Sequence, residues 1–190
     1  MSNERSHDGK KGKITMKKLG IVLGVLVGAF FVLGLVLPKH FVVEREIVIN
    51  KPKGFVFSQL KQLKNHKDWG PWAKRDPNMI TEYKGTDGTV GFVSAWSGND
   101  EVGVGEQEIK NIVEGERLDL ELRFKKPMEN NGEAYFVTET VGENQTKVRW
   151  GMKGESKFPM NVVCLVINMK GMLAKDFDEG LTSLKTVLER

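Results

Sequence analysis

The sequence predicts an α+β protein in which a curved antiparallel sheet of about seven strands wraps around a long C-terminal helix, preceded by one transmembrane helix. Three observations carry this prediction. Residues 19–37 form an uncharged apolar run, residues 79–154 alternate apolar and polar side chains, and residues 160–190 repeat apolar side chains at helical spacing. Strands with one apolar face need a partner that covers it, and the final helix supplies one.

The net charge of +4 comes from the beginning of the chain. Residues 1–18 hold six Lys or Arg against two acidic residues, which leaves 23 basic and 23 acidic residues for the remainder. A neutral domain offers no electrostatic surface for nucleic acid, so nucleic acid is not an expected partner. The basic segment is polar and poor in apolar residues, which predicts a disordered tail over residues 1–18.

Residues 19–37 lack charged and strongly polar side chains. At about 1.5 Å per residue this run approaches the roughly 30 Å hydrocarbon core, which predicts a single-pass transmembrane signal-anchor. A cleaved signal peptide is the alternative, but no small-x-small cleavage pattern follows the run. More Lys and Arg precede the run than follow it, so we expect a cytoplasmic N-terminus. The domain would then lie on the outer face of a plasma membrane, or of an inner membrane facing the periplasm.

Within the apolar run, Gly20, Gly24 and Gly28 recur at every fourth residue. This small-residue pattern allows two membrane helices to approach closely, and it favours a dimer through these glycines. The alternative is that the glycines reflect only the general frequency of glycine in membrane helices.

The soluble part, residues 39–190, begins with a strand and a short helix. Residues 41–49 are rich in β-branched side chains, which predicts a first strand. Pro52 marks a helix start, and apolar residues from Phe55 to Leu63 predict a short amphipathic helix. An irregular stretch follows, in which Trp69 and Trp72 could share one side of a helical turn and cap an open edge of the core.

Six further strands are predicted where apolar and polar side chains alternate. They cover residues 79–84, 92–96, 102–113, 118–124, 133–141 and 148–152. Short polar turns between neighbouring strands imply an antiparallel meander.

The C-terminal residues 160–190 predict one long helix, or a short and a long helix joined near Gly171. The apolar stripe along one side consists of Val166, Met169, Met172, Leu173, Phe177, Leu181, Leu184 and Leu188. We expect Gly171 and Gly180 to lie where the helix approaches the sheet closely, because each costs about 1 kcal/mol of helix propensity relative to Ala. Cys164, the one cysteine, lies among apolar residues and is expected to be a buried, inert thiol.

Three stretches resemble a known family: Glu46–Pro52 (EIVINKP), Pro71–Met79 (PWAKRDPNM) and Lys157–Met160 (KFPM). They are similar to the SRPBCC group, the START-related, polyketide cyclase/dehydratase-like domains that share a fold with the birch pollen allergen. The resemblance covers Phe41 to Arg190 and implies a helix-grip fold. Members of this group include lipid carriers, hormone receptors and cyclases, so the resemblance implies a fold and no particular activity.

The sequence predicts no catalytic residue, no cofactor and no metal site. It contains no His-Glu-x-x-His motif, no phosphate-binding loop and no dinucleotide fingerprint, and His66 is the histidine within the domain proper. The strands carry carboxylates that could in principle act as an acid/base pair, but a solvated strand face explains them better. The carboxylates in question are Glu106, Glu108, Glu121 and Glu133.

An apolar space between sheet and helix would suit a small ligand. The expected ligand-contacting residues of the sheet are Trp96, Leu120, Leu122, Phe136, Trp150 and Met152. Those of the final helix and its entry are Phe158, Met169, Met172, Leu173 and Phe177. The alternative is that these side chains fill the interior completely.

The sequence therefore predicts a membrane-tethered binder or carrier of a hydrophobic small molecule, such as a lipid- or polyketide-like compound. Two alternatives stay open. One is a ligand-free protein-interaction module at the membrane, and the other is an enzyme of the cyclase or dehydratase type.

Overall fold

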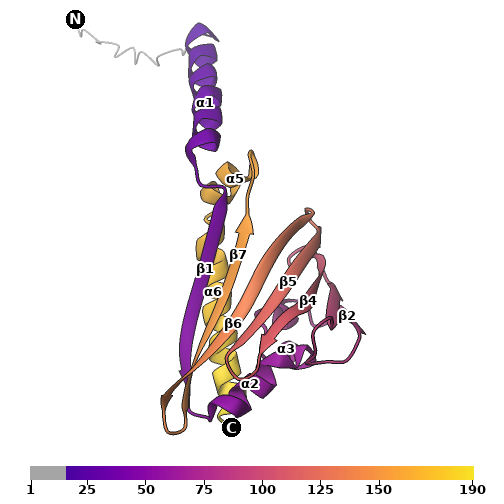
Figure 1. Cartoon of the computed structure of the whole chain (residues 1–190). Helices are drawn as coiled ribbons and strands as arrows, with labels where there is room; N and C mark the ends of the chain where they lie inside the picture. Colours follow the sequence, from indigo (N-terminus) through magenta and orange to yellow (C-terminus); the bar gives the residue numbers. More distant parts are fainter. Residues whose placement is uncertain (1–15) are drawn as a thin grey trace, which may run out of the picture. The chain divides into compact units, whose positions relative to one another are not determined.

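The computed structural model describes residues 16–190, which divide into two compact units between Leu37 and Pro38. The predicted tail lies outside the described residues as far as residue 15. Helix α1 (Met16–Val36) forms the first unit (Figure 1). By length and composition its Lys18–Val36 portion could cross a membrane, a property that it shares with signal sequences near an N-terminus.

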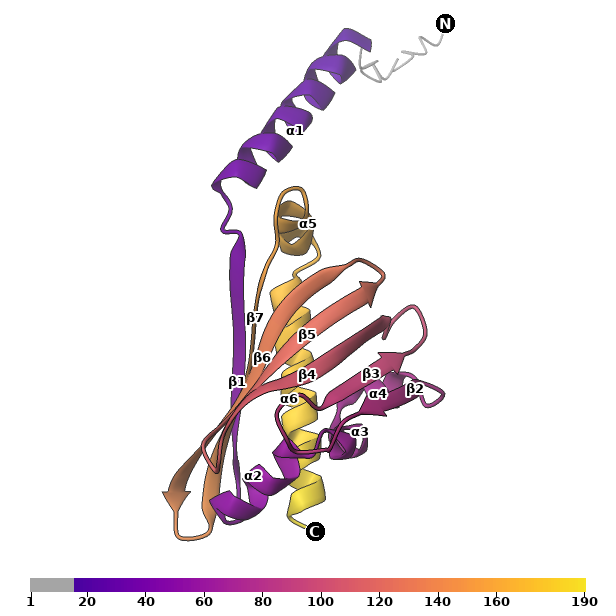
Figure 2. The same ribbon diagram turned by 45° about the vertical axis from the view of Figure 1, so that its right-hand side comes forward.

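The second unit is built on one seven-stranded antiparallel sheet in the order β1-β7-β6-β5-β4-β3-β2 (Figures 1 and 2). The strands are β1 (His40–Ile49), β2 (Ile80–Lys84), β3 (Val93–Ser97), β4 (Val104–Val113), β5 (Arg117–Lys126), β6 (Asn130–Gly142) and β7 (Gln145–Glu155). Strands β2 to β7 follow one another as the predicted meander, while β1 pairs with β7. The predicted fold class is confirmed.

The connection between β1 and β2 is more helical than the sequence indicated. It contains α2 (Lys53–Lys61), the 3-10 helix η1 (Leu63–Asn65), α3 (His66–Trp69) and α4 (Pro71–Arg75). The expected irregular stretch is thus two short helices that meet at Gly70, where Pro71 occupies the first turn of α4 without needing a backbone donor.

The stretch PWAKRDPNM connects α4 to the C-terminal helix and to the loop after β3. The Arg75 guanidinium of α4 pairs with the Asp176 carboxylate on the C-terminal helix. The buried Asp76 carboxylate accepts hydrogen bonds from the backbone N–H groups of Asn78 (3.0 Å) and Asn99 (2.7 Å). The charges of Arg75 and Asp76 are therefore explained by structural contacts, and neither residue needs a chemical role.

The C-terminal region forms α5 (Met160–Val166) and α6 (Met169–Leu188). The predicted alternative of a short and a long helix is confirmed, with the break three residues before Gly171 at Asn168, which adopts a left-handed conformation with φ of 53°. Asparagine tolerates this conformation better than most residues do. Because α5 is a separate helix, Val166 leaves the predicted stripe and is exposed.

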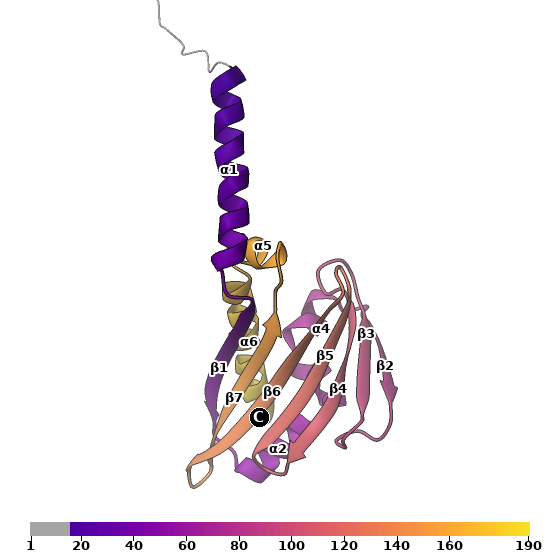
Figure 3. The same ribbon diagram turned by 45° about the horizontal axis from the view of Figure 1, so that its top comes forward.

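Helix α6 runs along the concave face of the sheet (Figures 2 and 3). The close approach expected at Gly180 is confirmed, since a Cβ there would lie 2.7 Å from the Trp150 ring. The expectation for Gly171 is wrong, because a Cβ at that position would meet the side chain of Asn168 and not the sheet.

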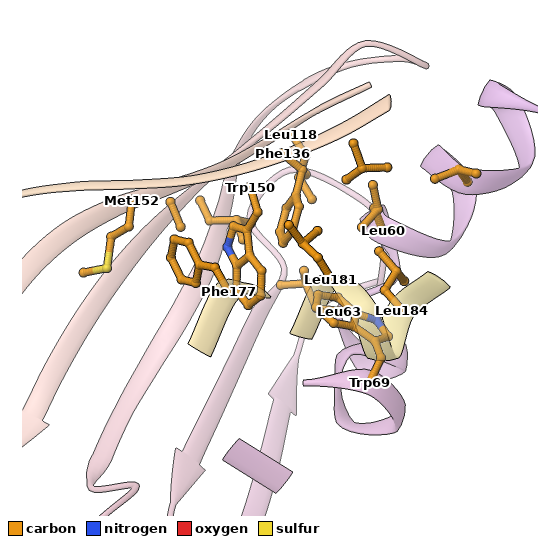
Figure 4. Packing of buried hydrophobic residues seen from close by; sticks show 14 of the residues in the cluster. Leu60, Leu63, Trp69, Leu118, Phe136, Trp150, Met152, Phe177, Leu181 and Leu184 are labelled. Atoms are coloured by element: carbon orange, nitrogen blue, oxygen red, sulfur yellow. The ribbon is translucent and has the colours of Figure 1, made fainter. Parts of the chain in front are cut away.

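A hydrophobic core joins the sheet, α6 and the helices between β1 and β2 (Figure 4). Phe177, Leu181, Leu184 and Leu188 of the predicted stripe are buried in it. Every residue of this core lies between Phe41 and Leu188, so the unit from Pro38 to Arg190 has its own core and needs no contribution from α1.

Candidate ligand-binding cavity

A cavity of about 1300 Å³ lies between the concave face of the sheet and α6. All eleven side chains that the sequence singled out line it, six from β3, β5, β6 and β7 and five from the β7–α5 connection and α6. The volume is somewhat above the range of about 300–1,000 Å³ that is usual for small-molecule sites. The alternative of a completely filled interior is therefore wrong.

The eleven residues divide into a wall and a rim. Leu120, Phe136, Trp150, Met152 and Phe177 are buried, so they belong to both the core and the cavity wall. The partly buried wall residues are Trp96, Leu122, Met169 and Leu173. The remaining two, Phe158 and Met172, are exposed and stand at the rim.

Trp150 organises the aromatic end of the cavity. Its ring stacks on Phe177 with centroids 4.2 Å apart and on its cross-strand partner Phe136 at 5.2 Å. Trp69 and Trp72 meet the same ring edge-on at 5.5 and 5.7 Å, so both tryptophans cover the core as expected, although from two helices instead of one. The Trp69 indole nitrogen is buried without a hydrogen-bond partner in the described part of the chain, and Figure 4 shows the Trp150 indole nitrogen on the Met152 side of its ring.

A row of polar side chains crosses β2, β3 and β4 on the inner face. Tyr83 lies opposite Ser94, Ser94 opposite Gln107, and Gln107 opposite Leu122, and all four line the cavity. Ser94 is only 7 % exposed. Over residues 16–190 neither the Ser94 hydroxyl nor the Gln107 amide has a protein hydrogen-bond partner, and neither is among the fully buried unpaired polar atoms, so both are open to water in the cavity. We name Tyr83, Ser94 and Gln107 the polar row.

Sequence analysis missed the polar row, although the signal was present. Ser94 stands two residues from Phe92 and from Trp96, so the period-two pattern puts it on the apolar face. Gln107 stands two residues before the buried Ile109 in the same way. The alternation pattern therefore already placed both polar residues, Ser94 and Gln107, on the inward face of their strands.

His66 adds a neutral imidazole to the cavity lining. Its ring lies against Trp69 and Phe136, with centroid distances of 4.7 and 5.6 Å, and its Nε2–H donates to the Leu60 carbonyl at 2.7 Å. Burial lowers the pKa of His66 to about 4, against the weaker raising effects of that hydrogen bond and of Asp87. At neutral pH the imidazole is uncharged, with Nδ1 as an acceptor.

The strand carboxylates considered for acid/base chemistry form ion pairs instead. Arg123 donates to Glu106 (2.7 Å), Glu108 (2.8 Å) and Glu121 (2.7 Å), and Lys153 pairs with Glu133 at 2.7 Å. The hydrogen bonds from Arg123 lower the pKa values of Glu106 and Glu108. Glu108 and Glu121 are direct cross-strand neighbours, so the guanidinium also relieves their repulsion. These contacts fit the interpretation as a charged strand face.

Cys164 differs from its predicted environment. It is half-buried, lines the cavity, and lies with its Sγ 3.6 Å from the Ser156 hydroxyl oxygen. The cause is the break at Asn168, which turns α5 away from the α6 stripe. Among the described residues, no group of three or more His, Cys, Asp or Glu side chains could hold a metal ion.

No protein-family model and no curated protein sequence matches the chain. Solved structures do match in fold. Norcoclaurine synthase from Thalictrum flavum, in complex with dopamine and hydroxybenzaldehyde, has a TM-score of 0.61 at 11 % identity, over 84 % of this chain and 92 % of that one. The Aha1 dimer from Colwellia psychrerythraea has a TM-score of 0.55 at 19 % identity, over 78 % and 96 %. Ara h 8.0201 has a TM-score of 0.53 at 13 % identity, over 80 % and 99 %.

At these low identities the likeness establishes the fold and no activity. The neighbours are helix-grip proteins of the SRPBCC type, and they cover the seven-stranded sheet and its C-terminal helix. The unit from Pro38 to Arg190 therefore has the helix-grip fold that the sequence resemblance implied.

Proposed function

We propose that the chain is a membrane-anchored binder or carrier of a hydrophobic small molecule that bears a hydrogen-bonding group. The observation that carries the proposal is the cavity of about 1300 Å³, which has an aromatic wall around Trp150 and the polar row on β2–β4. An apolar body would fill the space against the aromatic wall, while the ligand's polar group would pair with Ser94 and Gln107.

Binding is favoured over catalysis because the groups that the sequence offered for acid/base chemistry are engaged in other contacts or poorly suited to it. The strand carboxylates are held by Arg123 and Lys153. The pKa of His66 is about 4, which makes the imidazole a weak base at neutral pH. The complex of norcoclaurine synthase supports the proposal in a general way, since a protein of this fold holds dopamine and hydroxybenzaldehyde.

The proposed arrangement has three parts: a cytoplasmic tail (1–18), a signal-anchor helix (19–37) and a ligand-binding domain (39–190) on the outer face of the membrane. The apolar helix α1 supports the anchor. A dimer through Gly20, Gly24 and Gly28 also remains a proposal. It is supported by the open space that a Cβ added at each position would find among the described residues.

Native mass spectrometry of residues 39–190, purified without detergent, tests ligand binding directly. We expect a reproducible extra mass that matches an apolar compound in a solvent extract of the same sample. Leu122→Trp, which inserts an indole into the cavity wall, should lower the occupied fraction. Thr140→Trp, an equal insertion at an exposed strand position, should leave it unchanged.

If the measured mass stays that of the protein alone, even after incubation with mixed lipids, the proposal is overturned in favour of a protein-interaction module. An extra mass that Leu122→Trp does not reduce would show that the compound binds elsewhere.

A further inference from the structure

Helix α5 is an apolar helix with little to cover it. Its sequence, Met160 to Val166, contains no charged residue. Leu165 is 57 % exposed, Val166 78 % and the following Ile167 52 %, whereas Val162 and Asn161 are buried. Contiguous exposed apolar side chains of this kind mark an interaction surface in a protein that is otherwise well packed.

The exposed side of α5 is continuous with the rim of the cavity. Phe158, Ile167 and Met172 are exposed and also line the cavity. Met128, from the turn between β5 and β6, is exposed and lines the cavity too. We name the exposed apolar residues Met128, Phe158, Val163, Leu165, Val166, Ile167 and Met172 the rim patch. An apolar ligand that enters or leaves the cavity past the rim patch would therefore stay in contact with apolar side chains.

The charges that flank the rim patch are mostly positive. The segments 125–131 and 155–172 carry the lysines Lys125, Lys126, Lys157 and Lys170 and the glutamates Glu129 and Glu155. All four lysines are exposed. Lys157 pairs with Glu155 at 3.8 Å and Lys125 with Glu106 of β4 at 3.0 Å, which leaves Lys126 and Lys170 without an ion pair in the described part of the chain. An apolar patch with lysines around it matches the interface of a bilayer that contains anionic lipids.

The chain itself limits how far this rim can lie from a membrane. The apolar run ends at Leu37, and Pro38 and Lys39 are all that separate it from β1. The start of β1 is joined to the segment that leads into α5, because the Ser156 N–H donates to the Lys39 carbonyl at 2.6 Å and His40 pairs with Glu155. The three steps along the chain from Leu37 to His40 span at most about 10 Å. An anchor formed by residues 19–37 would therefore keep the start of β1 near the lipid surface.

We propose that the rim patch docks on the surface of an anionic lipid bilayer, so that the ligand passes between membrane and cavity without crossing water. The passage of ligand rests on the proposed function, and the anchor rests on α1. Docking itself would be a property of residues 39–190, so it can be tested without ligand and without α1. In this arrangement Leu165, Val166 and Ile167 enter the interface while the flanking lysines meet lipid phosphates. Met160 and Cys164, on the cavity side of α5, form part of the wall.

Vesicle flotation with residues 39–190 tests docking in the absence of α1. We use vesicles of phosphatidylcholine alone and of phosphatidylcholine mixed with phosphatidylglycerol. We expect binding to the mixed vesicles, weakened about tenfold or more by the double substitution Leu165→Asp and Val166→Asp. The matched control is Val90→Asp with Val113→Asp, two exposed apolar residues outside the rim patch, and it should bind as the unaltered domain does.

Three results would overturn docking: no binding to either vesicle, equal binding by the rim-patch variant, or loss of binding in the control as well. A concentration-dependent dimer of the domain that Leu165→Asp and Val166→Asp abolish would assign the patch to a second copy instead. Circular dichroism melting of each variant checks that the exposed substitutions leave the fold intact.

The ligand content of the same samples separates this inference from the proposed function. A domain that carries ligand but ignores vesicles overturns docking alone. A domain that docks but never carries a ligand overturns the binding function alone.

Discussion

Single side chains at the cavity wall divide into those that stabilise the core and those that the proposed ligand would contact. Trp150 contributes its whole ring to packing against Phe177 and Phe136, which stabilises the core whether or not a ligand is present. Ser94 and Gln107 differ from it, because their polar groups lack protein hydrogen-bond partners and face the cavity, where the proposed ligand would supply them. A polar group that faces a mostly apolar wall without a protein partner adds less to stability than an apolar side chain of the same size would.

The substitution Gln107→Leu tests this division. It removes a polar group without a protein partner from an apolar wall, so we expect the free energy of unfolding of the ligand-free domain to rise by about 1 kcal/mol. The occupied fraction in native mass spectrometry should fall at the same time. Unchanged occupancy together with higher stability would show that Gln107 does not contact the ligand.

His66 predicts a pH dependence of stability. Its folded pKa of about 4 lies below its ordinary value of 6.5, so the unfolded chain takes up the proton first as the pH falls. Stability contributed by the neutral imidazole is present above pH 6.5 and is lost between pH 6.5 and about 4, by an amount on the order of 3 kcal/mol. Urea unfolding at a series of pH values measures this loss. His66→Gln, which has no proton to gain, should remove that part of the pH dependence, and an unchanged profile would contradict it.

At the scale of elements, periodicity identified strands and helices reliably where one face is buried. The alternation over Leu118 to Phe124 and the stripe from Phe177 to Leu188 both lie where they were expected. The position of the break in the C-terminal helix was predicted only to within three residues, because it depends on one backbone conformation, that of Asn168, which hydrophobic spacing does not encode. The cavity could be predicted only as a set of lining residues, since its volume depends on how closely α6 approaches the sheet.

Gly180 sets that approach, and Gly180→Ala measures it. The new Cβ would lie 2.7 Å from the Trp150 ring and 3.2 Å from Pro71, so the helix or the indole must shift. Overpacking of this kind costs about 1–3 kcal/mol, and the gain in helix propensity offsets about 1 kcal/mol of it. We expect net destabilisation of about 1 kcal/mol in urea unfolding.

Gly171→Ala provides the matched control in the same helix. Its Cβ would meet the Asn168 side chain, which makes no side-chain cap hydrogen bond and can move. We expect no loss of stability, or a gain of up to about 1 kcal/mol from helix propensity. Equal effects of the two substitutions would contradict the close approach at Gly180.

At the scale of the whole molecule, the chain combines an apolar helix with a unit that has its own core. Local sequence patterns indicated both parts, because hydropathy and alternation are local properties. The inward positions of Ser94 and Gln107 could be read from the alternation, but their adjacency to each other and to Tyr83 depends on cross-strand register. That pairing arises only once the sheet has formed.

The anchor is tested on the full chain in membranes of the expressing cells. We expect the full-length protein to stay in the membrane pellet after alkaline carbonate extraction and to keep the mass of its N-terminal residues. The domain of residues 39–190 should be released by the same treatment, since docking through the rim patch is peripheral. A mature protein that lacks residues 1–37 would identify the apolar helix as a cleaved signal peptide instead.

The pairing of β1 with β7 has a consequence for biosynthesis. His40 and Glu155 are partners, yet about a hundred residues must be made between the two strands. At roughly 5–20 residues per second, β1 leaves the ribosome several seconds before its partner. During that interval its backbone donors and acceptors are unpaired, and long-range pairings of this kind form slowly. Newly made chains should therefore depend on chaperones to keep β1 from pairing with other strands.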